Sequence, residues 1–225
     1  MPASPQPQLH SAHVDTALSA PNTTVDWSVQ LTDVLLDQLA DTGVIVLHDV
    51  LPERLLQALR LASREMHGYR AAQLITDGVQ QQIRNDTTRW LQADDAVAAA
   101  YLRVLQDLGA FLNQQLFLGI RWAEAHFACY QAGQFYAQHR DNPKNSPKQG
   151  GARAISTVLY LNPAWPVTAG GQLQVIDRQG AVHEILPYDN QLVLFDSDLL
   201  HEVCPATQVR YSIASWLRRD AAPEL

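Results

Sequence analysis

The chain has 225 residues and a mass of 25.0 kDa, which suits one large domain better than two. A hydrophobic content of 47% and a formal net charge of −7 exclude a collagen-like or wholly disordered chain and the basic surface typical of nucleic-acid-binding proteins. No apolar run approaches the ~18 residues of a membrane span, and no basic residue precedes Arg54 as a secretion signal requires. We therefore expect a soluble cytoplasmic protein with neither membrane nor nucleic-acid partners, in which Cys129 and Cys204 stay reduced.

The amino-terminal part divides by composition and periodicity. Residues 1–24 are rich in Pro, Ala and Ser and predict a mobile tail, which leaves 25–225 as a single domain. Two helical segments are expected on either side of the strand-like segment 43–50. The second should begin near Pro52 and end with Gly68 as its C-cap.

A longer helix is predicted after the capping residues Asp94 and Asp95, ending near Gly119. Its apolar stripe consists of Val97, Tyr101, Val104, Leu108 and Phe111. Between this helix and the preceding one, residues 69–90 are polar and weakly patterned. We expect a long excursion or a loose hairpin there.

After Gly119 the hydrophobic period changes from helical to two. Short alternating or apolar runs occur at 122–130, 134–141, 154–162, 172–177, 181–186, 191–196 and 209–217. Such a series of short strands is typical of a β-sandwich or barrel. The predicted fold class is therefore α+β, with an antiparallel jelly-roll core and supporting helices, mainly amino-terminal, packed outside it.

The residues most suggestive of chemistry are His139, Asp141 and His201. Two side chains of one strand at spacing two share a face, so His139 and Asp141 can hold one metal ion, and His201 follows a strongly apolar strand and can add a third ligand. Two imidazoles and one carboxylate suit a non-haem Fe(II) oxygenase, although Zn²⁺ is an alternative. The same spacing in the tail, at His13 and Asp15, is interpreted as chance. Four other histidines are interpreted as structural or surface residues: His48, His67, His126 and His183.

Arg210 stands nine residues after His201, at the start of an alternating strand, and shares a face with Ser212, Ala214 and Trp216. A buried arginine needs an anionic partner. Capping of the strand or pairing with an acidic side chain would satisfy it. Together with a metal, however, Arg210 suits a dicarboxylate cosubstrate, because its planar fork fits the distal carboxylate and Ser212 can add a hydrogen bond.

Several motifs in this order resemble the Fe(II)- and 2-oxoglutarate-dependent oxygenases, and within them the prolyl 4-hydroxylase branch with the hypoxia-inducible-factor prolyl hydroxylases and their bacterial relatives. The segments are FACY (127–130), HRDNP (139–143), VLYLN (158–162), GGQL (170–173), HEV (201–203) and RYSIASW (210–216). The similarity extends more thinly to IRND at 83–86 and to Trp90.

The resemblance implies a double-stranded β-helix core with Fe(II) held by His139, Asp141 and His201. It further implies that Arg210 and Tyr160 bind the C5 carboxylate of 2-oxoglutarate. The other pocket residues implied are Tyr130 as lining, with Leu173 and Trp216 as apolar walls. Core packing is the alternative for the strand aromatics.

Substrate contacts are expected in the two irregular segments 69–90 and 141–153, because binding residues tend to lie on loops beside a rigid scaffold. By resemblance the residues concerned are Arg84, Asp86, Trp90 and Arg153. Ordinary surface salt bridges are the alternative for the charged members.

The activity implied by the resemblance is 4-hydroxylation of a prolyl residue in a protein, with O₂ and 2-oxoglutarate consumed, succinate and CO₂ released, and ascorbate in support. No catalytic side chain beyond the metal ligands is expected. Elongation factor Tu is the candidate substrate, an oxygen-sensing role is implied, and we expect a monomer. The alternatives are the same chemistry on a small molecule or another side chain, and a non-catalytic sensor of metal or 2-oxoglutarate.

Overall fold

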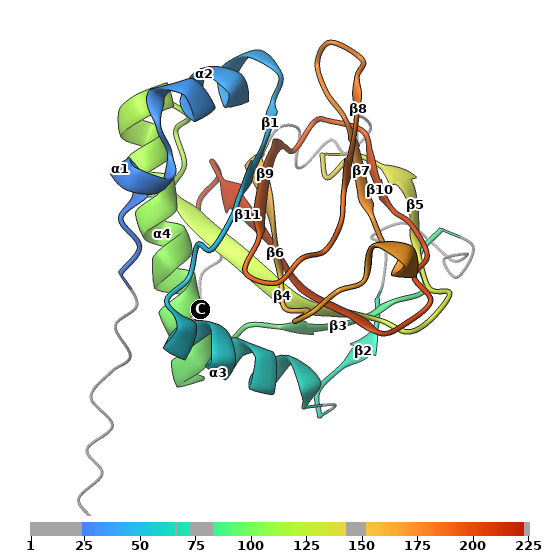
Figure 1. The fold of residues 1–225 in the computed structure, drawn as a ribbon. Helices are drawn as coiled ribbons and strands as arrows, with labels where there is room; N and C mark the ends of the chain where they lie inside the picture. Colours follow the sequence, from blue (N-terminus) through green and yellow to red (C-terminus); the bar gives the residue numbers. More distant parts are fainter. Residues whose placement is uncertain (1–23, 66, 73–82, 143–151, 223–225) are drawn as a thin grey trace, which may run out of the picture.

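The computed structural model describes residues 24–65, 67–72, 83–142 and 152–222. The tail predicted over 1–24 falls almost wholly outside these ranges, as does the His-x-Asp pair at His13 and Asp15. Within the described chain, helices pack on one side of a β-structure built from two antiparallel sheets (Figure 1). None of the helices seen there is both long enough and apolar enough to cross a membrane.

The described helical elements are α1 (Trp27–Gln30), α2 (Asp33–Asp41), α3 (Glu53–Arg64), α4 (Ala96–Leu116) and the 3-10 turn η1 (Val167–Ala169). Helix α4 begins where the sequence predicts, because the Asp95 carboxylate accepts hydrogen bonds from the backbone N–H groups of Val97 and Ala98 at 2.8 and 3.0 Å. It ends three residues before Gly119, since Phe117 takes a left-handed φ of 54°.

Helix α3 ends at Arg64, so the prediction that Gly68 is its C-cap is wrong. Glu65 is extended at the helix end. Side chains rather than a glycine satisfy the last carbonyl groups: Arg89 donates to the Ala62 oxygen at 2.6 Å and Tyr69 donates to the Ser63 oxygen at 2.8 Å.

The larger sheet has the order β1-β9-β6-β11-β4-β3-β2, and the smaller has the order β5-β10-β7-β8. The strands of the larger sheet are β1 (Val44–Leu47), β2 (Arg70–Ala71), β3 (Thr87–Trp90), β4 (Trp122–Tyr130), β6 (Arg153–Tyr160), β9 (Leu192–Asp196) and β11 (Arg210–Arg218). Those of the smaller sheet are β5 (Tyr136–His139), β7 (Leu173–Ile176), β8 (Val182–Ile185) and β10 (His201–Val203). All seven predicted runs form strands, and β2 pairs antiparallel with β3 among the described residues of the segment 69–90, as a hairpin requires. Strand β10 was not predicted.

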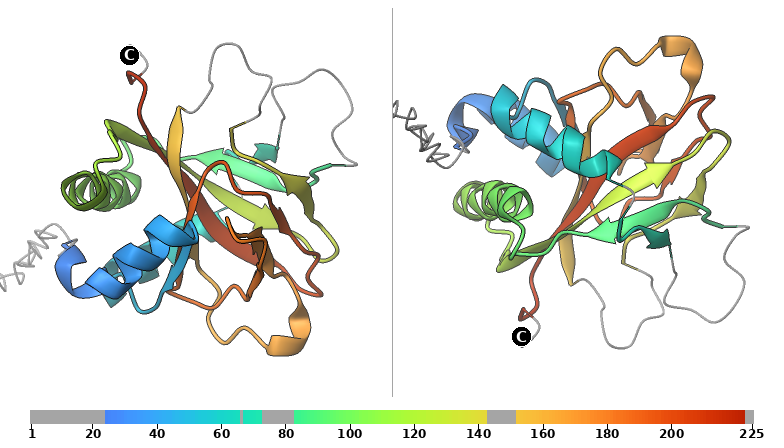
Figure 2. Two further views of the ribbon diagram at one scale, coloured as in Figure 1. Left: turned by 90° about the horizontal axis from the view of Figure 1, so that it is seen from above. Right: turned by 90° about the horizontal axis from the view of Figure 1, so that it is seen from below.

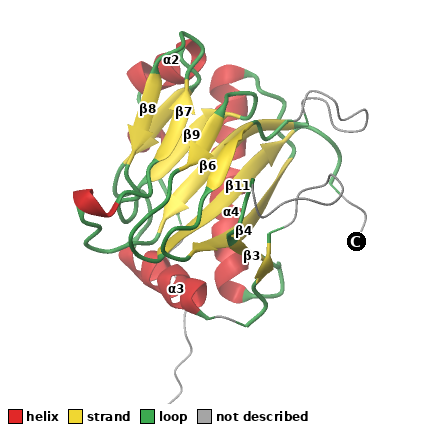
Figure 3. Cartoon of the chain, turned by 90° about the vertical axis from the view of Figure 1, so that its right-hand side faces the viewer, coloured by secondary structure: helices red, strands yellow, loops and turns green. Residues whose placement is uncertain are grey.

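Helices α3 and α4 cover the outer face of the larger sheet, as the views along and across the sheet show (Figures 2 and 3). Strand β11 divides its side chains between the two faces. Ile213 and Leu217 join the helix-covered core, whereas Arg210, Ser212 and Trp216 line a pocket on the inner side. The alternation predicted for this strand is confirmed, and it is what directs polar groups into the pocket.

Candidate functional site

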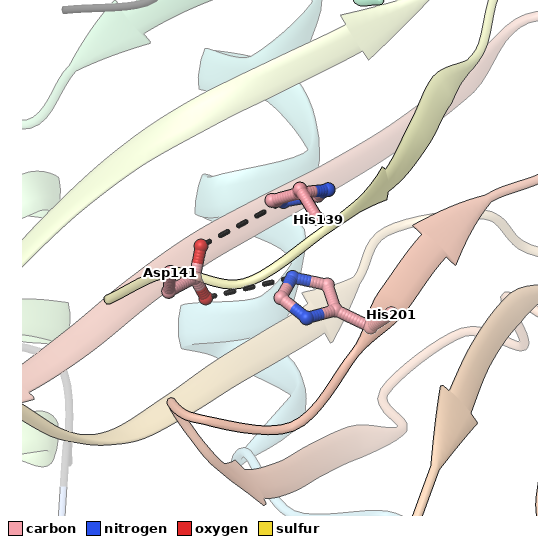
Figure 4. A group of neighbouring side chains, drawn as sticks. All are labelled: His139, Asp141 and His201. Atoms are coloured by element: carbon pink, nitrogen blue, oxygen red, sulfur yellow. Dashed lines mark ion pairs between the residues drawn. The ribbon is translucent and has the colours of Figure 1, made fainter. Parts of the chain in front are cut away.

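His139, Asp141 and His201 come together at one end of the smaller sheet (Figure 4). His139 is the last residue of β5 and pairs in register with His201, the first residue of β10. Asp141 follows β5 by two residues. Its Oδ1 lies 3.7 Å from His139 Nε2 and its Oδ2 lies 3.6 Å from His201 Nε2. One potential ligand atom from each residue lies within 4.8 Å of the others.

The two imidazoles are oriented by backbone carbonyl groups. Nδ1 of His139 lies 2.8 Å from the Ala137 oxygen, and Nδ1 of His201 lies 3.0 Å from the Leu199 oxygen. With a proton on each Nδ1, both Nε2 atoms present lone pairs to the shared space. Burial, followed by the neighbouring His201, lowers the pKa of His139 to about 3, so its imidazole is neutral at physiological pH.

The Asp141 carboxylate is anchored through one oxygen. Its Oδ2 accepts a 2.6 Å hydrogen bond from the Ser156 hydroxyl, which lies 2.9 Å from the hydroxyl of Ser197. Burial alone would raise the pKa of Asp141, but His201, His139 and other polar neighbours outweigh it and hold the pKa at about 2. The carboxylate is therefore ionised, with Oδ1 left for another partner.

Two imidazole nitrogens and one carboxylate oxygen on the same side of a space fit a divalent metal with open coordination positions. This donor set is the facial arrangement of non-haem Fe(II) oxygenases, and it would also accept Zn²⁺. The residues present thus fit the metal that the sequence predicts.

Arg210 is a buried positive charge in the pocket. It is 1% exposed, and no carboxylate of the described chain pairs with it. Its Nε donates to the Gly171 oxygen and its Nη1 to the Ser212 hydroxyl, both at 3.1 Å, while Nη2 has no hydrogen-bond partner among the described residues. A buried guanidinium whose Nη2 is left without a partner in the described part of the chain fits an anionic ligand.

Aromatic rings flank this guanidinium. Its central carbon lies 5.1 Å from the ring centroid of Tyr130 and 5.0 Å from that of Tyr160. Tyr130 and Leu173 line the pocket, but Tyr160, which is 0% exposed, does not; its hydroxyl has no hydrogen-bond partner in the described part of the chain. Burial raises the pKa of Tyr160, so its hydroxyl stays protonated and can donate.

The pocket has a volume of about 1160 Å³ and contains the three candidate ligands, Arg210 and Ser212. At its mouth Trp90 is 48% exposed, and its ring lies 6.1 Å from that of Trp216. Arg153 stacks on Trp216 at 3.9 Å, as expected of a residue at the pocket wall. Arg153 also donates to Glu124 at 3.0 Å and to the Asp141 carbonyl oxygen at 3.3 Å.

Arg84 and Asp86 form a covered ion pair, which contradicts the alternative of an ordinary surface salt bridge. Nε and Nη2 of Arg84 donate to the two carboxylate oxygens of Asp86 at 2.7 and 3.0 Å. Asp86 is 1% exposed, so it does not face an incoming ligand in this conformation. The expected contacts at 143–151 lie outside the described residues.

Three residues of the site were missed. His126 was interpreted as structural or surface; it is 3% exposed, which agrees with a structural residue, but it also lines the pocket, with its ring 5.1 and 5.3 Å from those of Trp90 and Trp216. Tyr136 stacks on His139 with 3.5 Å between ring centroids. Ser156 contacts Asp141 from a different strand, and no local signal in the sequence indicates that contact.

Comparison with known proteins gives a consistent result. Residues 125–218 match the family model of the 2OG-Fe(II) oxygenase superfamily. The chain is similar to a prolyl-4-hydroxylase from Pseudomonas putida (33% identity, TM-score 0.74, 84% of this chain and 98% of that chain). It is also similar to a prolyl hydroxylase from Trichoplax adhaerens in complex with a hypoxia inducible factor oxygen degradation domain peptide fragment (26% identity, TM-score 0.75, 88% of this chain and 94% of that chain).

Among curated proteins, Egl nine homolog 1 of Rattus norvegicus is 35% identical over 98 residues, or 41% of this chain. The Homo sapiens protein of the same name has the same identity over the same length. The match spans 28% of the rat protein and 22% of the human protein, so the matched part of this chain corresponds to about a quarter of each relative.

Proposed function

Because the chain belongs to the 2OG-Fe(II) oxygenases, in their prolyl 4-hydroxylase branch, we propose that it hydroxylates the 4-position of a prolyl residue in a protein substrate. The observation that carries the proposal is a single pocket that holds both the cluster of His139, Asp141 and His201 and the unpaired cation of Arg210. These two features provide for a metal at one end of a dicarboxylate and for a fixed positive charge at the other.

Fe(II) and 2-oxoglutarate, when bound, would supply the oxidising chemistry: O₂ and 2-oxoglutarate are consumed, one oxygen atom enters a C–H bond of the substrate, and succinate and CO₂ leave. The protein's own side chains would bind and orient the metal and the cosubstrate. The three ligands would hold the metal by one face, and Arg210 with Ser212 would fix the distal carboxylate. Tyr160, whose ring centroid lies 5.0 Å from the guanidinium carbon, would donate its hydroxyl hydrogen to the same carboxylate. No side chain is required to move a proton from the substrate carbon.

The walls of the pocket would keep the reacting atoms from water. Leu173 and Trp216 are 1% and 8% exposed and supply apolar surface beside the polar ligands. Ascorbate would support turnover as a reductant. We also propose a monomeric cytoplasmic enzyme with an oxygen-sensing role, as the resemblance implies.

The volume of the pocket favours a substrate residue that is part of a peptide over a free amino acid. A volume of about 1160 Å³ exceeds the ~300–1,000 Å³ of typical small-molecule sites. The exposed indole of Trp90 at the mouth offers an apolar surface to a longer chain. Aromatic surfaces are also what proline-rich segments dock against in other domains. Elongation factor Tu is the candidate protein, proposed from the family resemblance.

The test uses the full chain with Fe(II), 2-oxoglutarate and O₂, first alone and then with prolyl peptides and purified elongation factor Tu. The expected result is succinate formation that increases with the substrate, together with a mass gain of one oxygen atom on a proline. His139→Ala should abolish both. Turnover only with free amino acids would show that the substrate is a small molecule and not a protein. Metal and 2-oxoglutarate binding without turnover on any substrate would favour a sensor.

A further inference from the structure

We propose that Tyr136, Arg84 and Asp86 are positioning residues that hold the imidazole of His139 in place for the metal. This inference rests on the metal-binding role given to His139 above. It gives the Arg84–Asp86 pair a role at the metal centre, and Arg84 also lines the pocket.

The first step is the contact between Tyr136 and His139. Their ring centroids are 3.5 Å apart and their planes differ by 13°, which is a stacked arrangement. His201 approaches His139 at 4.1 Å with an angle of 55°. The backbone oxygen of Ala137 holds Nδ1 at 2.8 Å. The Tyr136 ring thus supplies the broad surface that restricts rotation of the imidazole about its own axis.

The second step is the cation on Tyr136. The guanidinium carbon of Arg84 lies 4.5 Å from the Tyr136 ring centroid, within the range of a cation–π contact. Arg84 is fixed in turn by the two hydrogen bonds to Asp86. The side chains of Arg84 and Asp86 are only 11% and 0% exposed, so this contact is largely shielded from water. Asp86, Arg84, Tyr136 and His139 therefore form a continuous row of contacts that ends at the metal ligand.

The third step is the backbone, which ties the same segment to β5. Ala137 N–H donates to the Ile83 oxygen at 2.7 Å, Asn85 N–H donates to the Phe135 oxygen at 3.3 Å, and Phe135 N–H donates to the Asn85 side-chain oxygen at 2.8 Å. Arg84 and Tyr136 form an antiparallel bridge between these bonds. The segment 83–85 runs along the free edge of the strand that carries His139, so the row of side chains and the strand move together.

Because the side chains of Arg84 and Asp86 are buried, the pair suits a positioning role better than recognition of a ligand. A buried ion pair often adds little net stability, because the desolvation penalty offsets the Coulomb attraction, so the pair is better explained here by the geometry that it fixes. Ile83, beside Arg84, is 41% exposed and lines the pocket. A ligand at the mouth of the pocket that shifts Ile83 would also move Arg84. Through Tyr136, that movement would change the position of the His139 imidazole.

The experiment measures binding of Mn²⁺ to the chelator-treated full chain, without 2-oxoglutarate, from the EPR signal of free Mn²⁺. Tyr136→Leu removes the stack and Asp86→Asn removes the anchor of Arg84, and each should weaken Mn²⁺ binding about 10-fold. Tyr136→Phe keeps the ring and should bind within about threefold of the parent. The absorption spectrum of bound Co²⁺ should shift for Tyr136→Leu and Asp86→Asn and stay unchanged for Tyr136→Phe.

Matched controls come from elsewhere in the chain. Asp189→Asn breaks a comparable bond between Asp189 and Arg60, and Tyr188→Leu removes a ring; neither Tyr188 nor Asp189 lines the pocket. Both control variants should bind Mn²⁺ like the parent. Circular dichroism and the melting temperature identify folded variants, and Arg84→Met replaces Asp86→Asn if the latter does not fold.

Equal Mn²⁺ affinity of the folded Tyr136→Leu and Asp86→Asn proteins and the parent would overturn the inference and leave the proposed function intact. The same holds if Tyr136→Phe is as weak as Tyr136→Leu, because the hydroxyl rather than the ring would then be responsible. A parent protein that does not bind Mn²⁺ or Co²⁺ would overturn the metal site itself, and with it both proposals.

Discussion

Replacement of Arg210 by methionine tests how the pocket holds the cosubstrate. Arg210 is 1% exposed, its Nε and Nη1 donate to Gly171 and Ser212, and its Nη2 has no hydrogen-bond partner among the described residues. Methionine removes the charge and keeps most of the volume. A carboxylate bound in a buried site without its cation costs roughly 3–5 kcal/mol. We expect the affinity for 2-oxoglutarate to fall by about two to three and a half decades.

The same structure predicts an opposite effect on stability. In the protein without ligand, no described carboxylate pairs with the Arg210 guanidinium, so replacing it by an apolar side chain should leave the melting temperature unchanged or raised. Arg218→Met is the matched control, since Arg218 lies on the same strand and is 6% exposed but bonds to Glu124 and to Asp220. That variant should lose stability and keep its affinity for 2-oxoglutarate.

The assay is anaerobic titration of the Fe(II)-loaded protein with 2-oxoglutarate, followed by the charge-transfer absorption that chelation produces. A second titration uses 2-oxopentanoate, which has the same chelating group but no distal carboxylate. The Arg210→Met change should weaken only 2-oxoglutarate, so the ligand and the side chain form a double-mutant cycle. Equal losses for both ligands, or no loss for 2-oxoglutarate, would refute the assignment of Arg210 to the distal carboxylate.

Three further predictions follow from neighbouring contacts. Ser156→Ala removes the 2.6 Å hydrogen bond to Asp141 and should weaken Mn²⁺ binding by about 10- to 100-fold, measured by EPR. Gly171→Ala should weaken 2-oxoglutarate binding, measured by calorimetry, because the added Cβ would lie 3.0 Å from the Ala206 Cβ and displace the carbonyl group that holds Arg210. Burial, followed by the nearby Arg84, lowers the pKa of His126 from 6.5 to about 4, so this residue should make the free energy of unfolding rise by about 3 kcal/mol between those pH values.

The sign of the last effect follows from proton binding. Between pH 4 and 6.5 the unfolded chain protonates His126 and the folded chain does not, so stability is lost as the pH falls through this window. The free energy of unfolding, measured with denaturant at a series of pH values, should depend more steeply on pH for the parent than for His126→Phe, and only within this window. Parallel curves of stability against pH would contradict the prediction. For Gly171→Ala the control is Gly180→Ala, which has a similar left-handed φ of +86° but no atom within 4 Å of the new Cβ. For Ser156→Ala, unchanged Mn²⁺ affinity would show that the hydroxyl does not orient Asp141.

The sequence alone was sufficient where the physics is local. Strand alternation at spacing two placed Arg210, Ser212 and Trp216 on one face of β11, and the structure agrees. The Asp95 carboxylate and the apolar stripe predicted α4 for the same reason, because a cap and a helical period involve only residues a few positions apart.

Tertiary structure decided every relation that depends on pairing between distant segments. The alignment of His201 with His139 arises from the register of β10 on β5, which 61 residues of intervening chain do not encode locally. Ser156 of β6 reaches Asp141 only because the fold brings β6 of the larger sheet next to the end of β5. Burial likewise depends on what packs above a residue, and for that reason Arg84 and Asp86, which are compatible with a surface pair in the sequence, form a shielded contact beside the metal ligand.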